Sequence, residues 1–100
     1  MTENESAVMQ KQRVEVEPPG MYKVVFKNDD VTPMEFVIRV LMDIFCLDFA
    51  KAHILTLMIH ETGSGVAGTY TKDIAFTKVK ETEDVAKNFG FPLSVIAEKE

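Results

Sequence analysis

The sequence predicts a small α+β domain with elements in the order βααβαβ, in which three helices pack on a three-stranded sheet. Two observations carry this prediction. Apolar and polar residues alternate with a period of two soon after residue 20, and three later segments place apolar residues at helical spacing. A chain of 100 residues, 46% hydrophobic and 27% charged, has the length and composition of one globular domain.

Residues 1–19 are predicted to be a flexible tail and residues 20–100 the folded core. The tail is polar, mixed in charge and without a sustained period, and Pro18-Pro19-Gly20 ends it with a turn-prone hinge. The alternation typical of a half-buried strand begins at Tyr22. It stops at Asn28-Asp29-Asp30, whose side chains favour a turn by bonding to the backbone.

A first helix is predicted to begin at Thr32. This residue would cap the free N–H groups, Pro33 suits the first helical position, and Glu35 would complete a capping box. Cys46 falls in the same apolar stretch, and we interpret it as a core residue rather than a reactive thiol. The apolar stripe of this helix comprises Phe36, Val37, Val40, Leu41, Ile44 and Phe45.

A second helix is predicted between Asp48, as its cap, and Gly63, as its stop. Its inward side would carry Ala52, Leu55 and Ile59, with Met58 as a further candidate. Residues 63–68 are expected to be loop, and residues 66–71 are typical of a second strand.

A third helix is predicted over residues 73–88, with Gly90 stopping it. A last strand over residues 93–98 follows Pro92. The helix would bury Ile74, Ala75, Val79, Val85 and Ala86.

Composition excludes several classes of function. The net charge of −5 argues against a nucleic-acid binder, which usually carries a basic face. No apolar run approaches the ~20 residues of a membrane-spanning helix. The first residues are acidic and have the pattern of neither a signal peptide nor a transit peptide, so we expect the protein in the cytoplasm.

The sequence indicates neither a metal site nor a catalytic nucleophile. A single cysteine cannot form an internal disulfide or a thiolate cage. His53 and His60 are seven residues apart on one helix, or roughly 10 Å, which is too far for joint coordination of one ion. Ser64 and Ser94 belong to no motif that pairs them with a base.

The Asn28-Asp29-Asp30 turn is the densest cluster of acceptors in the chain. An ammonium group offers three donors and no acceptor, so such a cluster suits a free amino group. The residues alone leave two other interpretations open. In the first, the turn serves only the backbone and the helix start, as such turns commonly do. In the second, the carboxylates hold a hard cation. The cation interpretation lacks the alternating acceptors of a calcium loop.

Five motifs then resemble one known family. They stand in the expected order and spacing at residues 18–24 (PPGMYKV), 28–37 (NDDVTPMEFV), 59–63 (IHETG), 77–78 (TK) and 92–93 (PL). The second motif is highly specific. Residues 18–100 therefore resemble the ClpS family, the adaptors of the bacterial N-degron pathway.

The resemblance implies a non-enzymatic adaptor with three helices on a three-stranded antiparallel sheet. Members of this family bind proteins whose first residue is Leu, Phe, Tyr or Trp. They pass these substrates to the unfoldase ClpA, or ClpC in some lineages, for degradation by ClpP. We expect a monomer without cofactor or metal.

The resemblance also assigns roles to individual residues. The α-amino group would be bound by Asn28, Asp30 and His60, and the backbone that follows it by Asp29 and Thr32. The pocket for the first side chain would be lined by Met34, Val37, Thr56, Ile59 and Leu93. The unfoldase would dock on Asp73, Phe76, Thr77 and Lys78.

Two positions depart from the family pattern. Thr56 stands where the family usually has Met, which predicts a roomier pocket that admits Ile or Val more readily or grips Leu less tightly. Alternatively, Met34 shifts to fill the space. Phe76 replaces a common Glu, which puts the strength of docking and the choice of unfoldase in doubt, although Asp73 and Lys78 keep the family's charges.

Two other functions compete with the adaptor. One is an interaction domain with the same element order, such as the C-terminal domain of the ribosomal stalk protein, which has no reason to carry the Asn-Asp-Asp turn. The other is a small hydrolase using Asp30 and His60, which predicts turnover rather than binding alone.

Overall fold

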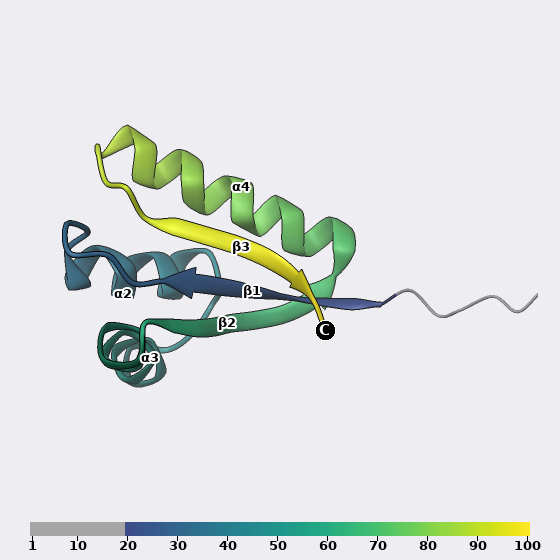
Figure 1. Ribbon diagram of the computed structural model, residues 1–100, viewed down its shortest axis with the longest axis horizontal. Helices are drawn as coiled ribbons and strands as arrows, with labels where there is room; N and C mark the ends of the chain where they lie inside the picture. Colours follow the sequence, from purple (N-terminus) through teal and green to yellow (C-terminus); the bar gives the residue numbers. More distant parts are fainter. Residues whose placement is uncertain (1–19) are drawn as a thin grey trace, which may run out of the picture.

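The computed structural model describes residues 20–100, so the predicted tail of residues 1–19 lies outside the described part of the chain. The predicted order βααβαβ and the α+β class are confirmed. In chain order, the elements are β1 (Met21–Lys27), α2 (Met34–Asp43), α3 (Phe49–Thr62), β2 (Ser64–Thr71), α4 (Lys72–Asn88) and β3 (Ser94–Lys99) (Figure 1).

The sheet has the strand order β2-β1-β3, and β1 is antiparallel to both neighbours. Val24 and Phe26 of this central strand are fully buried in the core. Simple alternation would leave Val25 on the opposite, open face. It is nevertheless buried, because Val66 and Ile96 lie beside it in register on the neighbouring strands.

The core lies between the sheet and the three helices. Leu41 of α2 is fully buried, and Phe45 meets Phe26 edge to face with 5.4 Å between ring centroids. Ala75 and Ala86 supply the buried side of α4, so this helix approaches the sheet through small side chains. Within residues 20–100, no helix is both long enough and apolar enough to cross a bilayer.

Both predicted ends of α3 are confirmed. The carboxylate of Asp48 accepts from Lys51 N–H at 2.8 Å, which satisfies one of the free donors at the helix start. Gly63 ends the helix with φ of 98°, and its N–H donates to Ile59 C=O. This left-handed conformation is unfavourable for residues with a Cβ, which explains the glycine.

The predicted capping box at the start of α2 is wrong. Pro33 occupies the cap position, and no side chain caps the helix. The Thr32 hydroxyl donates to Asp29 Oδ2 at 2.9 Å, so it is committed to the preceding turn. The sequence pattern alone could not show that Asp29 competes for this hydroxyl.

The interpretation of Cys46 as a core residue is also wrong, because α2 ends before it and its side chain is exposed. Cys46 has φ of 60°, and the next N–H, of Leu47, donates back to Leu41 C=O at 3.1 Å. This bond spans six residues, one more than in a Schellman motif, and cysteine takes the left-handed position at which glycine is usual. The left-handed residue reverses the chain, which carries the thiol out of the apolar stripe.

Three smaller expectations also fail. Met58 and Ile74 are about half exposed rather than buried. The expected loop after Gly63 is strand from Ser64 onward, because Ser64 pairs directly with Lys27 of β1. Gly65, which belongs to this strand, is buried under α3. A Cβ on Gly65 would lie 2.8 Å from Ile59 Cγ1, so the close approach of β2 and α3 requires glycine.

We expect the substitution Leu41→Ala to lower the free energy of unfolding by about 2–5 kcal/mol, because it leaves a cavity at a fully buried site. The matched change Leu57→Ala, at a side chain that is 39% exposed, should cost about 1 kcal/mol or less. Urea unfolding followed by circular dichroism measures both values. Equal losses would contradict this description of the core.

Candidate functional site

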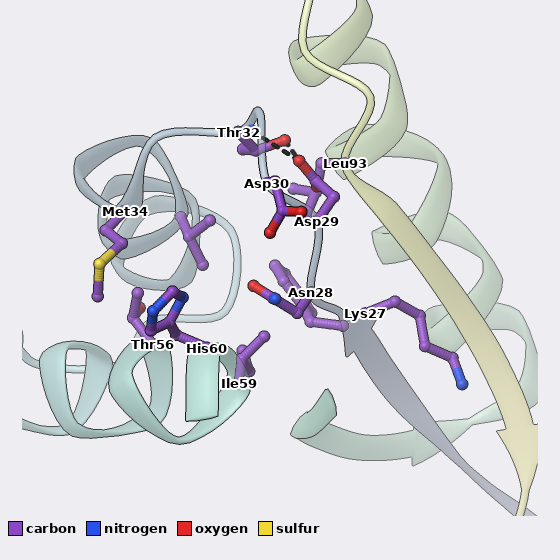
Figure 2. Close-up of a pocket in the computed structure, with 12 residues that line it drawn as sticks. Lys27, Asn28, Asp29, Asp30, Thr32, Met34, Thr56, Ile59, His60 and Leu93 are labelled. Carbon is purple, nitrogen blue, oxygen red and sulfur yellow. Dashed lines mark hydrogen bonds between the residues drawn. The ribbon is translucent and has the colours of Figure 1, made fainter. Parts of the chain in front are cut away.

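A pocket of about 220 Å³ opens where the end of β1, the turn that follows it, α2, α3 and the segment before β3 meet (Figure 2). Ten of its lining residues are the ten predicted to bind the amine, the backbone or the first side chain of a substrate. The complete lining is Phe26, Lys27, Asn28, Asp29, Asp30, Thr32, Met34, Val37, Thr56, Ile59, His60 and Leu93.

One side of the pocket is polar. Asn28 and Asp30 are exposed turn residues, and His60 is an exposed residue in the last turn of α3. Figure 2 shows the side chains of Asn28 and Asp30 directed toward the space between the turn and α3, where the His60 ring lies. Asn28 N–H donates to Gly63 C=O at 2.9 Å, which holds the turn against the end of that helix.

Asp29 organises the turn. Its Oδ1 accepts from Val31 N–H at 2.8 Å and from Thr32 N–H at 2.6 Å, and its Oδ2 accepts from the Thr32 hydroxyl at 2.9 Å. Burial raises the pKa of Asp29, but these hydrogen bonds outweigh it and hold the pKa below its ordinary value. A carboxylate has about four acceptor positions, so about one remains for another donor.

By contrast, Asp30 keeps its carboxylate unengaged. Within residues 20–100, neither a backbone N–H nor a side chain bonds to it, and the same holds for the side-chain amide of Asn28. The side chains of these neighbouring polar residues therefore have different roles. That of Asp29 is committed to the fold, while those of Asn28 and Asp30 are available to a ligand.

The other side of the pocket is apolar. Leu93 lies just before β3 and is buried together with two residues from α2 and α3, Val37 and Ile59. Met34, the first residue of α2, is half-buried, and Figure 2 shows it on the same side of the pocket as Thr56. The site thus joins unengaged acceptors to a wall that suits an apolar side chain.

Thr56 contributes shape to this wall rather than a free donor. It is only 3% exposed, and its hydroxyl donates to Ala52 C=O of its own helix at 2.8 Å. Because the hydroxyl hydrogen is already used, Thr56 presents less polarity to the pocket than the sequence suggests.

Sequence reasoning missed two lining residues. Phe26 is an apolar residue of the strand alternation, two positions before the turn, and this position was the available signal. Lys27 is the last residue of β1, and Figure 2 shows its side chain directed away from the pocket. Lys27 lines the pocket because it directly precedes the turn, and the chemistry of its side chain gave no reason to predict it as a lining residue.

The four predicted docking residues lie on α4, outside this pocket. Asp73, Phe76 and Thr77 are exposed, and the Phe76 ring lies 5.7 Å from the ring of Tyr22. Lys78 is half-buried: its Nζ donates to a backbone carbonyl, that of Ile44, at 2.8 Å. Lys78 also lies over two aromatic rings, those of Phe45 and Tyr70. It therefore has a structural role that its sequence position did not reveal.

A larger cavity of about 510 Å³ lies between α2 and α4. Its walls include Phe36, Val85 and Phe89. Its two carboxylates, Glu35 and Asp43, stand eight residues apart on α2 with Arg39 between them, whereas the acceptors of the turn lie on adjacent residues. Chemistry rather than size therefore distinguishes the pocket at the turn. Within residues 20–100, no three His, Cys, Asp or Glu side chains are grouped so that they could hold a metal ion.

Comparison with known proteins gives consistent matches. Residues 17–96 match the family model described as ATP-dependent Clp protease adaptor protein ClpS. Two curated relatives, from Burkholderia cenocepacia (strain HI2424) and Burkholderia multivorans (strain ATCC 17616 / 249), are each described as ATP-dependent Clp protease adapter protein ClpS. Each is 43% identical over 95 residues, which cover 95% of this chain and 91% of the relative.

Among solved structures, that of Agrobacterium tumefaciens ClpS2 bound to L-phenylalaninamide is similar, with a TM-score of 0.81 and 41% sequence identity. The match covers 83% of this chain and all of the other. The fold described above therefore matches that of a solved ClpS structure.

We expect Asp29→Asn to lower the free energy of unfolding at neutral pH by about 1 kcal/mol, because a neutral amide replaces a carboxylate that accepts three hydrogen bonds. The pKa of Asp29 is lowered in the folded state, so its contribution is complete above the unfolded value near 3.9. It is lost as the pH falls through the folded pKa. The gap between wild type and variant should shrink below about pH 4 in urea unfolding; a gap that widens there would contradict the assignment.

Proposed function

This chain belongs to the ClpS family of ATP-dependent Clp protease adaptor proteins, and we propose that it captures proteins through a free α-amino group and a bulky apolar first residue. The observation that carries the proposal is the division of the pocket. Unengaged acceptors on Asn28 and Asp30, with His60 opposite, face the same cavity as a wall of apolar side chains.

In this proposal the substrate ammonium donates to Asn28, Asp30 and His60. A protein α-amino group has an ordinary pKa near 7.7–8.0, so it is mostly charged at neutral pH and matches this set of acceptors. Each hydrogen bond to a charged group contributes about 1.5–3 kcal/mol when shielded from water. An acetylated terminus carries no charge and would leave these acceptors unpaired, which provides discrimination.

The first side chain of the substrate would occupy the apolar part of the pocket. Burial of one large apolar side chain contributes about 1.5–3 kcal/mol, and the costs of association offset part of the sum. Affinity in the micromolar range would suit an adaptor that must release its cargo. The solved ClpS2 from Agrobacterium tumefaciens is bound to L-phenylalaninamide, a compound with a free α-amino group and a bulky apolar side chain, which supports this ligand class.

The backbone of the next substrate residue would meet Asp29 and Thr32. Asp29 keeps about one acceptor position beyond its three bonds within the turn, and the Thr32 oxygen can accept while its hydrogen is donated to Asp29. Their contribution to affinity is therefore smaller than that of Asp30, and their larger role is to hold the turn in its binding shape.

Delivery would follow capture. We propose that the N-terminal domain of a ClpA-type or ClpC-type unfoldase docks on α4 at Asp73, Phe76 and Thr77, which are exposed. Lys78 would act there chiefly by holding the end of α2 against α4 through its bond to the Ile44 carbonyl. Loss of docking in a Lys78 variant would then partly reflect this structural role.

We expect Asp30→Ala to weaken binding of a peptide with a free N-terminal Phe by at least about tenfold, because one charged hydrogen bond is lost. Acetylation of the peptide should abolish binding to wild type. Fluorescence anisotropy measures both effects, and Asp43→Ala, an exposed carboxylate outside the pocket, is the matched control. Amine-dependent binding that survives Asp30→Ala would refute the site assignment, and cleavage of the peptide would instead favour the hydrolase.

The size of the residue at position 56 should set the side-chain specificity. We expect wild type to bind peptides beginning with Ile or Val as well as Leu or Phe, and Thr56→Met to reduce Ile and Val binding about tenfold relative to Phe. Thr56→Val keeps the shape without the hydroxyl, so it should preserve the wild-type pattern. A strong preference of wild type for Leu and Phe over Ile and Val would contradict this expectation and favour a pocket filled by Met34.

A further inference from the structure

The cavity between α2 and α4 has an aromatic wall made of three rings. Those of Phe36, Phe89 and Phe91 contact one another in every pairing, with ring centroids between 4.9 and 6.2 Å apart. The other apolar walls come from both helices. Phe89 is nevertheless 65% exposed. An exposed ring at the edge of an apolar cavity of about 510 Å³ is the kind of surface that a ligand covers.

Backbone hydrogen bonds fix two rings of this wall. Gly90 has φ of 78°, a left-handed conformation that favours glycine. Its N–H donates to Lys87 C=O at 3.0 Å, and the N–H of Phe91 donates to Ala86 C=O at 2.9 Å, which forms a Schellman ending of α4. Phe89 and Phe91 therefore stand on either side of Gly90, with 20° between their ring planes. The aromatic wall is thus formed before any ligand binds.

This cavity adjoins the pocket at the turn. Pro33 lines the cavity, while its neighbours on both sides, Thr32 and Met34, line the pocket. The same division occurs before β3, where Phe91 lines the cavity and Leu93 lines the pocket. Figure 1 shows the end of α4 at the same end of the sheet as the turn that follows β1. The start of α2 and the segment before β3 therefore form a ridge between the pocket and the cavity.

A bound substrate would leave the pocket beside this ridge. In the proposed function, the substrate backbone that follows the first residue meets Asp29 and Thr32, and Thr32 directly precedes Pro33. A helix is about 10 Å across, so about three extended residues of about 3.3 Å each would cross the ridge. Counted from a second residue at Thr32, the side chain that reaches the cavity is that of about the fifth residue of the substrate.

We infer that the cavity between α2 and α4 is a second subsite for the substrate, which binds a bulky apolar side chain near the fifth residue. This inference rests on the proposed function, because it requires the first residue to occupy the pocket at the turn. Glu35, Arg39 and Asp43 place both signs of charge on the rim, so the apolar walls select the occupant. Capture would then depend on the substrate sequence beyond its first residue.

Two other occupants fit the geometry less well. Residues 1–19 of this chain join the domain through Gly20 and Met21, at the opposite end of β1 and roughly 20 Å from the turn. The unfoldase is proposed to dock on α4 between Asp73 and Lys78, and Phe89 lies roughly 16 Å beyond Lys78 along the helix. A docked unfoldase would therefore leave the cavity open to the substrate.

Fluorescence anisotropy of the full chain with labelled peptides tests the subsite. Each peptide has a free N-terminal Phe followed by Gly and Ser, and carries either Phe or Ser at its fifth position. We expect the peptide with the second Phe to bind about fivefold more tightly, because the gain from burying the ring is partly offset by the ordering of the linking residues. Moving the second Phe from the third to the seventh position should give the tightest binding near the fifth.

Matched variants locate the gain. Phe89→Ala should remove it without changing the affinity for the peptide with Ser, because Phe89 lies outside the pocket at the turn. Phe49→Ala should retain the gain, because Phe49 is 59% exposed but lies outside the cavity. Circular dichroism checks that both variants keep their fold.

Two kinds of failure are distinguishable. Equal binding of the two peptides to wild type, or a gain that survives Phe89→Ala, would overturn the subsite and leave the proposed function standing. If no peptide binds in a way that depends on its free amine, the proposed function fails and the subsite fails with it.

Discussion

The hydrogen bond from Asn28 N–H to Gly63 C=O, at 2.9 Å, joins the two segments on which the polar side of the pocket depends. It connects the end of the central strand to the end of α3, which are 35 residues apart in the chain. Gly63 can take part because its left-handed backbone turns the chain directly from α3 into β2. His60, one helical turn earlier, is thereby held beside the acceptors of the turn.

Neighbouring residues of the turn have different roles although their chemistry is similar. Asp29 directs its carboxylate back to the backbone and to the Thr32 hydroxyl, and this internal bonding shapes the turn. Asn28 and Asp30 are consequently held in place while no group within residues 20–100 bonds to their side chains, which leaves these side chains available to a ligand. A preformed arrangement of this kind lowers the cost of ordering when a ligand binds.

Helix α3 joins three parts of the molecule through different sides. Its buried side packs on the core and on Gly65, and its last turn presents His60 to the pocket. The side opposite the core, which carries Ile54, Leu57 and Met58, is exposed and apolar. Amphipathic periodicity indicates one inward side of a helix, so it could not anticipate this distribution. The expected burial of Met58 failed for this reason, while the burial of Ala52 and Ile59 was predicted correctly.

The sequence by itself determined the order of the elements, both ends of α3 and ten of the twelve residues that line the pocket, because these depend on local spacing and on a specific motif. Tertiary structure decided how individual groups are used. The Thr32 hydroxyl serves the turn instead of the helix, Cys46 points to solvent, and Lys78 bonds to a distant carbonyl. Each outcome is set by competition among partners that only the folded chain brings together, and a linear pattern contains no record of that competition.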